Sequence, residues 1–115
     1  MVRSLYFLNL NVKSDMNISV DFDDTYTRDP NMWNTVIAVM QTAGHNVYCV
    51  TARTPEQGLD VYSSIGRMVG ADNCYFPSLH AKKPFMWAQG IRIDVWVDDT
   101  PMAVYNHYNI GIIFP

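Results

Sequence analysis

The feature that most constrains the fold of this chain is its alternation of short apolar runs with helix-like patterns. Strands joined by single helices need crossover connections, which favour parallel pairing. We therefore predict an α/β fold: a three-layer, Rossmann-like core with a mainly parallel five-stranded sheet and helices on both faces. The apolar runs lie at residues 17–20, 46–50, 73–76, 91–97 and 110–114.

Two of the helical patterns have recognisable beginnings. Asp29 is followed by Pro30, which predicts an N-cap and a proline at the first helical position, and Gly44 marks the end of that helix. Residues 54–57 form a capping box, and we expect the helix after it to continue to Gly70. The buried stripe of this second helix would consist of Leu59, Tyr62, Ile65 and Met68 or Val69.

Two shorter helices are expected nearer the C-terminus. Pro84 would open a helix that runs to Gln89, and a second helix would extend from about Pro101 to His107. Each would lead into one of the last two strands.

Size and composition exclude several classes of protein. A chain of 115 residues that is 49% hydrophobic and 17% charged folds as one soluble domain, and no apolar run is long enough to span a membrane. The net charge of −3 argues against a broad nucleic-acid-binding face. Cys49 and Cys74 lie in apolar runs, so we expect two free buried thiols and a cytoplasmic location.

Chemically reactive side chains follow the apolar runs directly. Residues 21–25 follow the first run, residues 51–53 the second, residues 80–84 the third, and Asp98 with Asp99 the fourth. Ligands of parallel α/β sheets bind at the carboxyl ends of the strands, so these side chains should converge. Clustered carboxylates repel one another unless a cation neutralises them, and oxygen ligands favour a hard ion such as Mg²⁺.

Each of these motifs, taken singly, has an ordinary structural explanation, since paired aspartates often cap turns. Taken together and in order, they resemble the haloacid dehalogenase (HAD) superfamily. Residues 20–25 resemble its first motif, Asp-x-Asp-x-Thr after an apolar strand, and residues 50–51 resemble the second, a hydroxyl at a strand end. Lys83-Pro84 looks like the third motif and residues 97–99 like the fourth.

The resemblance extends over residues 17–114 and implies a catalytic domain at residues 17–115; residues 1–16 lie outside it as an N-terminal extension or edge strand. The spacing is also similar to the phosphatase half of phage polynucleotide kinases and to small nucleotidase-like members. It therefore suggests a phage or bacterial source.

The resemblance implies a phosphohydrolase that forms an aspartyl-phosphate intermediate. Asp21 would be the nucleophile, and Asp23 would protonate the leaving oxygen and then activate water. Thr51 and Lys83 would hold the phosphoryl oxygens. Lys82 is the competing lysine; we prefer Lys83 because Pro84 starts a helix directly after it.

The resemblance also implies a bound Mg²⁺ ion. Its ligands would be Asp21, the backbone carbonyl of Asp23, Asp98 and, directly or through water, Asp99, which would otherwise orient Lys83. Candidate substrate contacts are Asp24, Thr25, Arg28, Ala52, Arg53 and Lys82.

The segment between Asp23 and Thr51 has room for one helix and no cap domain, so the site should be open. The expected substrate is a phosphorylated, nucleotide-like small molecule or a nucleic-acid end. Residues 5–12 alternate partly and are rich in strand formers, so they form either an extra edge strand or a strand that pairs with a second subunit. We predict a homodimer.

Two other classes of protein compete with the enzyme. A catalytically idle module could keep the fold and bind a phosphorylated ligand, but it need not keep both Asp21 and Asp23. A response-regulator-like receiver also clusters aspartates with a threonine and a lysine. Its phosphoacceptor follows the third strand, where this chain has Phe76-Pro77-Ser78.

Overall fold

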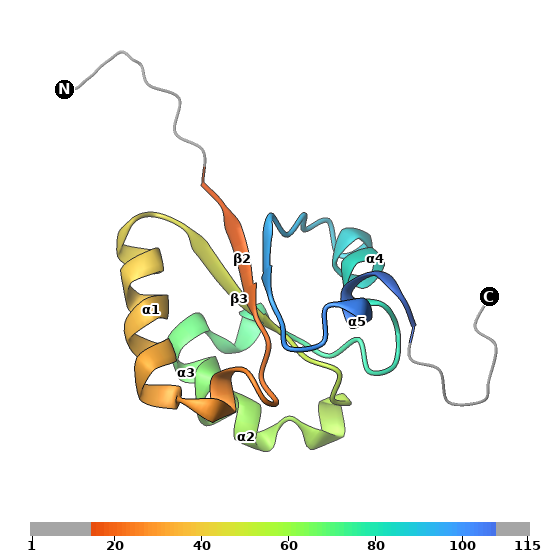
Figure 1. Ribbon diagram of the computed structural model, residues 1–115, viewed down its shortest axis with the longest axis horizontal. Helices are drawn as coiled ribbons and strands as arrows, with labels where there is room; N and C mark the ends of the chain where they lie inside the picture. Colours follow the sequence, from red (N-terminus) through yellow and green to blue (C-terminus); the bar gives the residue numbers. More distant parts are fainter. Residues whose placement is uncertain (1–14, 108–115) are drawn as a thin grey trace, which may run out of the picture.

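A single parallel sheet organises the protein (Figure 1). The computed structural model describes residues 15–107. The sheet has the order β4-β3-β2-β5, and every neighbouring pair is parallel. Its strands are β2 (Asn17–Val20), β3 (Asn46–Val50), β4 (Cys74–Tyr75) and β5 (Val95–Val97).

The prediction of a mixed α/β fold with a parallel sheet is confirmed for four strands. The expected fifth strand at 110–114 and the N-terminal strand at 5–12 lie outside the described residues. The five-stranded sheet therefore stays a prediction, as does the homodimer that rests on the N-terminal strand.

The chain order places a switch point beside β2. From β2 the chain adds β3 and then β4 on one side, and it returns to the opposite side of β2 to form β5. Val20 pairs with Val97, and the backbone N–H of Asp21 donates a 2.9 Å hydrogen bond to the Val97 carbonyl. Asp21 and Asp98 therefore leave two adjacent strand ends at the place where open α/β sheets bind ligands.

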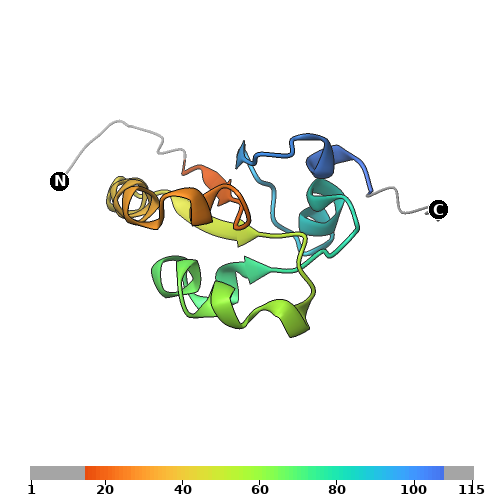
Figure 2. The same ribbon diagram turned by 60° about the horizontal axis from the view of Figure 1, so that its bottom comes forward.

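Helices cover both faces of the sheet (Figure 2). On one face, the buried Ile37 of α1 (Pro30–Thr42), Val61 of α2 (Leu59–Tyr62) and Ile65 of α3 (Ile65–Val69) join one apolar core. On the other, Met86 of α4 (Lys82–Ala88) packs with Val50 in a second core, and α5 (Met102–Tyr105) lies beside α4. Among the described residues, no helix has the length and apolar character needed to cross a membrane.

Short 3₁₀ turns complete the connections: η1 (Tyr26–Arg28), η2 (Pro55–Gln57) and η3 (Ala71–Asn73). Asp29 caps α1 as predicted, because its Oδ1 accepts a 3.1 Å hydrogen bond from the Met32 N–H. Cys49 and Cys74 are free and buried, which was also predicted.

The region from the capping box to Gly70 differs from the prediction of one long helix. The capping box forms, but it opens η2, and two short helices follow. The backbone of Ser64 is non-helical, so the phase of the helix changes between α2 and α3. The predicted stripe is therefore wrong in α2, where Leu59 is 80% exposed and Val61 is buried instead. Tyr62 is exposed too.

Other element ends also differ from the predictions. The strand expected at 91–97 is confined to β5, and the helix expected at 101–107 is confined to α5. The helix expected to start at Pro84 starts two residues earlier, because the Phe85 N–H already donates to the Ala81 carbonyl at 3.3 Å. Pro84 is tolerated in this first turn, where a backbone N–H has no helical partner.

Candidate functional site

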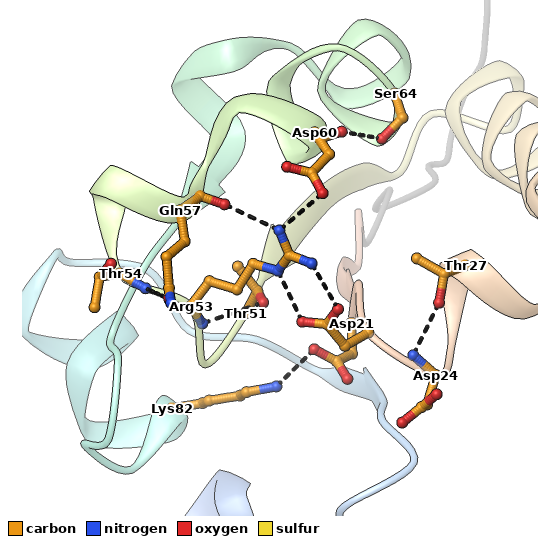
Figure 3. Close-up of polar contacts among 11 residues, drawn as sticks. Asp21, Asp24, Thr27, Thr51, Arg53, Thr54, Gln57, Asp60, Ser64 and Lys82 are labelled. Carbon is orange, nitrogen blue, oxygen red and sulfur yellow. Dashed lines mark hydrogen bonds and ion pairs between the residues drawn. The ribbon is translucent and has the colours of Figure 1, made fainter.

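A buried cluster of charged side chains lies at the carboxyl edge of the sheet. Asp21 follows β2, Asp98 follows β5, and Lys82 is the first residue of α4. The Nζ atom of Lys82 lies 2.9 Å from Oδ1 of Asp21 and 2.5 Å from Oδ2 of Asp98. The chain thus brings two carboxylates from neighbouring strands onto one ammonium group, as Figure 3 shows for Asp21 and Lys82.

Burial controls the electrostatics of this cluster. The side chains of Lys82, Asp21 and Asp98 are 2%, 9% and 3% exposed. Burial raises the pKa of Asp21 to about 7; Lys82 opposes this shift and Asp98 adds to it. Burial also acts to lower the pKa of Lys82, but the two carboxylates outweigh it, so the net pKa of Lys82 is raised. The lysine therefore keeps its proton.

Asp99 adds a third carboxylate to the cluster. Oxygens of Asp21, Asp98 and Asp99 lie within 4.8 Å of one another, a spacing at which they could hold one metal ion. The Asp99 carboxylate accepts a hydrogen bond from the hydroxyl of the buried Thr25 at 3.4 Å. The three carboxylates outnumber the one lysine, which pairs with Asp21 and Asp98, so the donor set fits a divalent cation with oxygen ligands.

The expectation that Lys83 would lie in the site is wrong. Lys83 is exposed, and its Nζ lies 5.2 Å from the centre of the Tyr105 ring. Successive residues of a helix point about 100° apart, so only one of two adjacent lysines can face the sheet edge. Because α4 begins at Lys82, that residue faces the carboxylates.

A second polar network surrounds Arg53, close to the first (Figure 3). Its Nε and Nη2 atoms each donate a 3.0 Å hydrogen bond to the carboxylate of Asp23. The guanidinium lies 4.8 Å from the centre of the Phe22 ring. Its Nη1 lies 3.0 Å from Oδ2 of Asp60 and donates to the Gln57 carbonyl, also at 3.0 Å. The pKa of Arg53 is raised, chiefly by its hydrogen bond to Asp23.

Asp60 is the residue of this network that the sequence analysis missed. It lies in the first turn of α2, where an acidic residue usually needs no further explanation. Its pKa is lowered, first by a hydrogen bond from its own backbone and then by Arg53. Only the tertiary structure shows that Asp60, in α2, forms an ion pair with Arg53, which follows β3.

The second network borders a cleft of about 430 Å³, lined by Asp23, Arg53, Glu56, Gln57, Leu59 and Asp60. A larger hollow of about 660 Å³ lies along α1, lined by Asn34, Thr35, Ala38, Val39, Thr42 and Ala43. None of these six side chains titrates near neutral pH, so the hollow along α1 offers no acid or base. We therefore place the candidate site at the sheet edge.

The remaining predicted residues lie around the two networks. Thr51 is fully buried, and its hydroxyl accepts a 3.4 Å hydrogen bond from the backbone N–H of Arg53. Asp24 adopts a positive φ of 60° in the turn after β2, and its backbone N–H donates to the Thr27 hydroxyl. Arg28 is exposed at the end of η1 and Ala52 is half-buried, so their roles in substrate binding stay predictions.

No family model, no curated protein and no solved structure matches this chain. The similarity to the HAD superfamily therefore rests on the four sequence motifs. The function that it implies is a proposal.

Proposed function

We propose that this protein is a Mg²⁺-dependent phosphohydrolase that works through an aspartyl-phosphate on Asp21. The observation that carries the proposal is the convergence of Asp21, Asp98, Asp99 and Lys82 at one sheet edge. A phosphoryl group carries charge on three oxygens, and its transfer needs a nucleophile and several cationic or hydrogen-bonding groups. This cluster supplies both kinds of group.

In the first step, an oxygen of Asp21 attacks phosphorus and the bond to the leaving oxygen breaks. Asp23 gives its proton to that leaving oxygen, which departs as an alcohol. Lys82 pairs with Asp21 and Asp98. We assign it the role of binding a phosphoryl oxygen when the substrate arrives. Thr51 is the hydroxyl closest in sequence to the end of β3, and we assign it the same role.

In the second step, Asp23 removes a proton from water, and the water oxygen attacks the phosphorus of the aspartyl-phosphate. The bond between phosphorus and Asp21 breaks, which releases inorganic phosphate and restores both carboxyl groups. Asp21, Asp98 and Asp99 would hold Mg²⁺ beside this reaction, with the backbone carbonyl of Asp23 as a further ligand. The ion would supply positive charge to the phosphoryl oxygens.

The proposed substrate class rests on the resemblance to the HAD superfamily and on the way in which the strand ends are connected. The connection from β2 to β3 contains only η1 and α1, and no cap covers the strand ends within residues 15–107. We propose a phosphorylated, nucleotide-like small molecule or a nucleic-acid end as the substrate. The cleft beside Asp23 would take the leaving group, because Asp23 protonates the leaving oxygen.

Turnover of p-nitrophenyl phosphate and of a panel of nucleotides tests the proposal. We expect hydrolysis with Mg²⁺, none with EDTA, and none by the Asp21→Asn variant. Retention of activity in EDTA or in that variant would contradict the mechanism. Binding of phosphorylated ligands without any turnover would instead show the idle binding module.

A further inference from the structure

The Asp23 carboxylate differs from that of Asp21 in its freedom to move. The side chain of Asp23 is 50% exposed, whereas that of Asp21 is buried. An exposed aspartate samples several rotamers, and an acid held in one of them reacts more often. The two parallel hydrogen bonds from Arg53 select one orientation of Asp23, since a bidentate pair has a fixed planar geometry.

Arg53 needs its own support to act in this way, because its side chain is long and flexible. The edge of the guanidinium that carries Nε and Nη2 faces Asp23, and Nη1 is bound by Asp60 and by the Gln57 carbonyl. The guanidinium also lies against the Phe22 ring. Asp60 thus holds the part of Arg53 that Asp23 does not use. Figure 3 shows Asp60 against the Arg53 guanidinium.

We propose that Asp60 is a positioning residue that acts on Asp23 through Arg53. The proposal rests on the proposed function, in which Asp23 is the general acid and base. Asp60 touches neither the nucleophile nor the leaving group in this scheme. Its effect is confined to steps in which the orientation of Asp23 matters.

The first test compares two leaving groups in the Asp60→Asn variant. For phenyl phosphate, whose leaving oxygen needs a proton, kcat/KM should fall about three- to fivefold, since exposed ion pairs contribute little each. For p-nitrophenyl phosphate, which leaves without help, kcat/KM should stay the same, because kcat/KM does not include the later attack of water that both substrates share. An equal loss of kcat/KM for both substrates would overturn the proposal.

Asp72→Asn is the matched control. It makes the same chemical change on η3. This turn directly precedes β4, so it lies at the amino ends of the strands and the candidate site lies at their carboxyl ends. We expect wild-type kinetics for it with both substrates. A loss equal to that of Asp60→Asn would show a general effect of charge and overturn the proposal.

The second test asks whether Asp60 acts through Arg53. Arg53→Met should lower kcat/KM for phenyl phosphate by more than Asp60→Asn does. Adding Asp60→Asn to Arg53→Met should then have no further effect, because coupled residues are not additive. Losses that multiply would show that Asp60 acts by another route.

An NMR measurement separates this proposal from the proposed function. The Nε–H signal of Arg53 should be sharp in the wild type, where Asp23 and Asp60 hold the guanidinium, and should broaden or vanish in Asp60→Asn. Asp72→Asn should leave it unchanged. If the wild type hydrolyses no phosphate ester, the proposed function fails, and an unaltered Arg53 signal in Asp60→Asn would still refute the coupling by itself.

Discussion

The Nζ atom of Lys82 lies 2.9 Å from Oδ1 of Asp21, although 61 residues separate them in the chain. The same ammonium group pairs with Asp98, and all three side chains are buried. Burying charges is unfavourable, and here a single ammonium group offsets that cost for two carboxylates. The cluster is therefore a place where single substitutions should have large effects.

Substitution of each of the two adjacent lysines in turn tests which one acts in the candidate site. Lys82→Met should lower turnover by about 10²–10³-fold, as loss of a group that stabilises transition-state charge does. It should also lower the free energy of unfolding by about 3 kcal/mol without metal, because two buried carboxylates lose their partner. Lys83→Met, which changes an exposed residue, should alter neither quantity. Kinetics and urea denaturation of both variants decide this, and equal effects would contradict the assignment.

Asp21→Asn removes the nucleophile while keeping the shape of the side chain. Turnover should fall at least roughly 10³-fold while the fold persists. Steady-state kinetics measures the turnover, and circular dichroism checks that the variant is folded. Near wild-type rates would assign the nucleophile elsewhere.

The same variant should be more stable than the wild type in EDTA at neutral pH. Burial raises the pKa of Asp21 from 3.8 to about 7, so the folded protein binds this proton more tightly than the unfolded chain does. Ionised Asp21 therefore destabilises the fold, fully at pH values above 7 and not at all below about 4. The stability of Asp21→Asn relative to wild type should rise by roughly 2–4 kcal/mol from pH 4 to 8. Urea denaturation at several pH values measures this. If the difference in the free energy of unfolding between the variant and the wild type does not vary with pH, the prediction is contradicted.

Mg²⁺ should stabilise the folded protein, because only the fold brings Asp21, Asp98 and Asp99 together. At 100 times its Kd, the ion should add about 2.7 kcal/mol to the free energy of unfolding. Thermal denaturation with and without Mg²⁺ measures this. Asp98→Asn should weaken the effect, and Asp72→Asn should leave it intact. An equal shift in both variants would place the ion elsewhere.

Asp23→Asn should lower turnover most for substrates with poor leaving groups. Only those substrates need a proton on the leaving oxygen, whereas p-nitrophenolate departs unprotonated. The ratio of kcat/KM for phenyl phosphate to kcat/KM for p-nitrophenyl phosphate should therefore fall in the variant. A loss of kcat/KM that is equal for the two substrates would argue against the acid role.

The sequence by itself determined the kind of fold and the position of most candidate residues. Short apolar runs with single helices between them predict parallel strands, and residues that follow the runs must then lie at one edge. Asp21 and Asp98 meet there as expected. Local signals of this sort depend on neighbours in the chain, so they can be recognised without a structure; the Asp29 N-cap is another example.

Local signals were less informative where a helix ends or changes phase. Pro84 suggested a helix start, yet the first turn of α4 begins at Lys82 and extends over the proline. That shift of two residues decides which lysine is buried. The break at Ser64 likewise moved the buried face of α2 from Leu59 to Val61. Packing against the sheet sets which side of a short helix is buried, and this packing cannot be recognised from the sequence alone.

Only the tertiary structure decided how the charged groups are shared between partners. Arg53 could be placed at the end of β3 from the sequence, but its pairing with Asp23 on one side and Asp60 on the other could not. Asp23 and Arg53 lie 30 residues apart in the chain and belong to different strand ends. Contacts of this kind exist only after β2 and β3 pair and α2 folds back, because no interaction between near neighbours in the chain requires them.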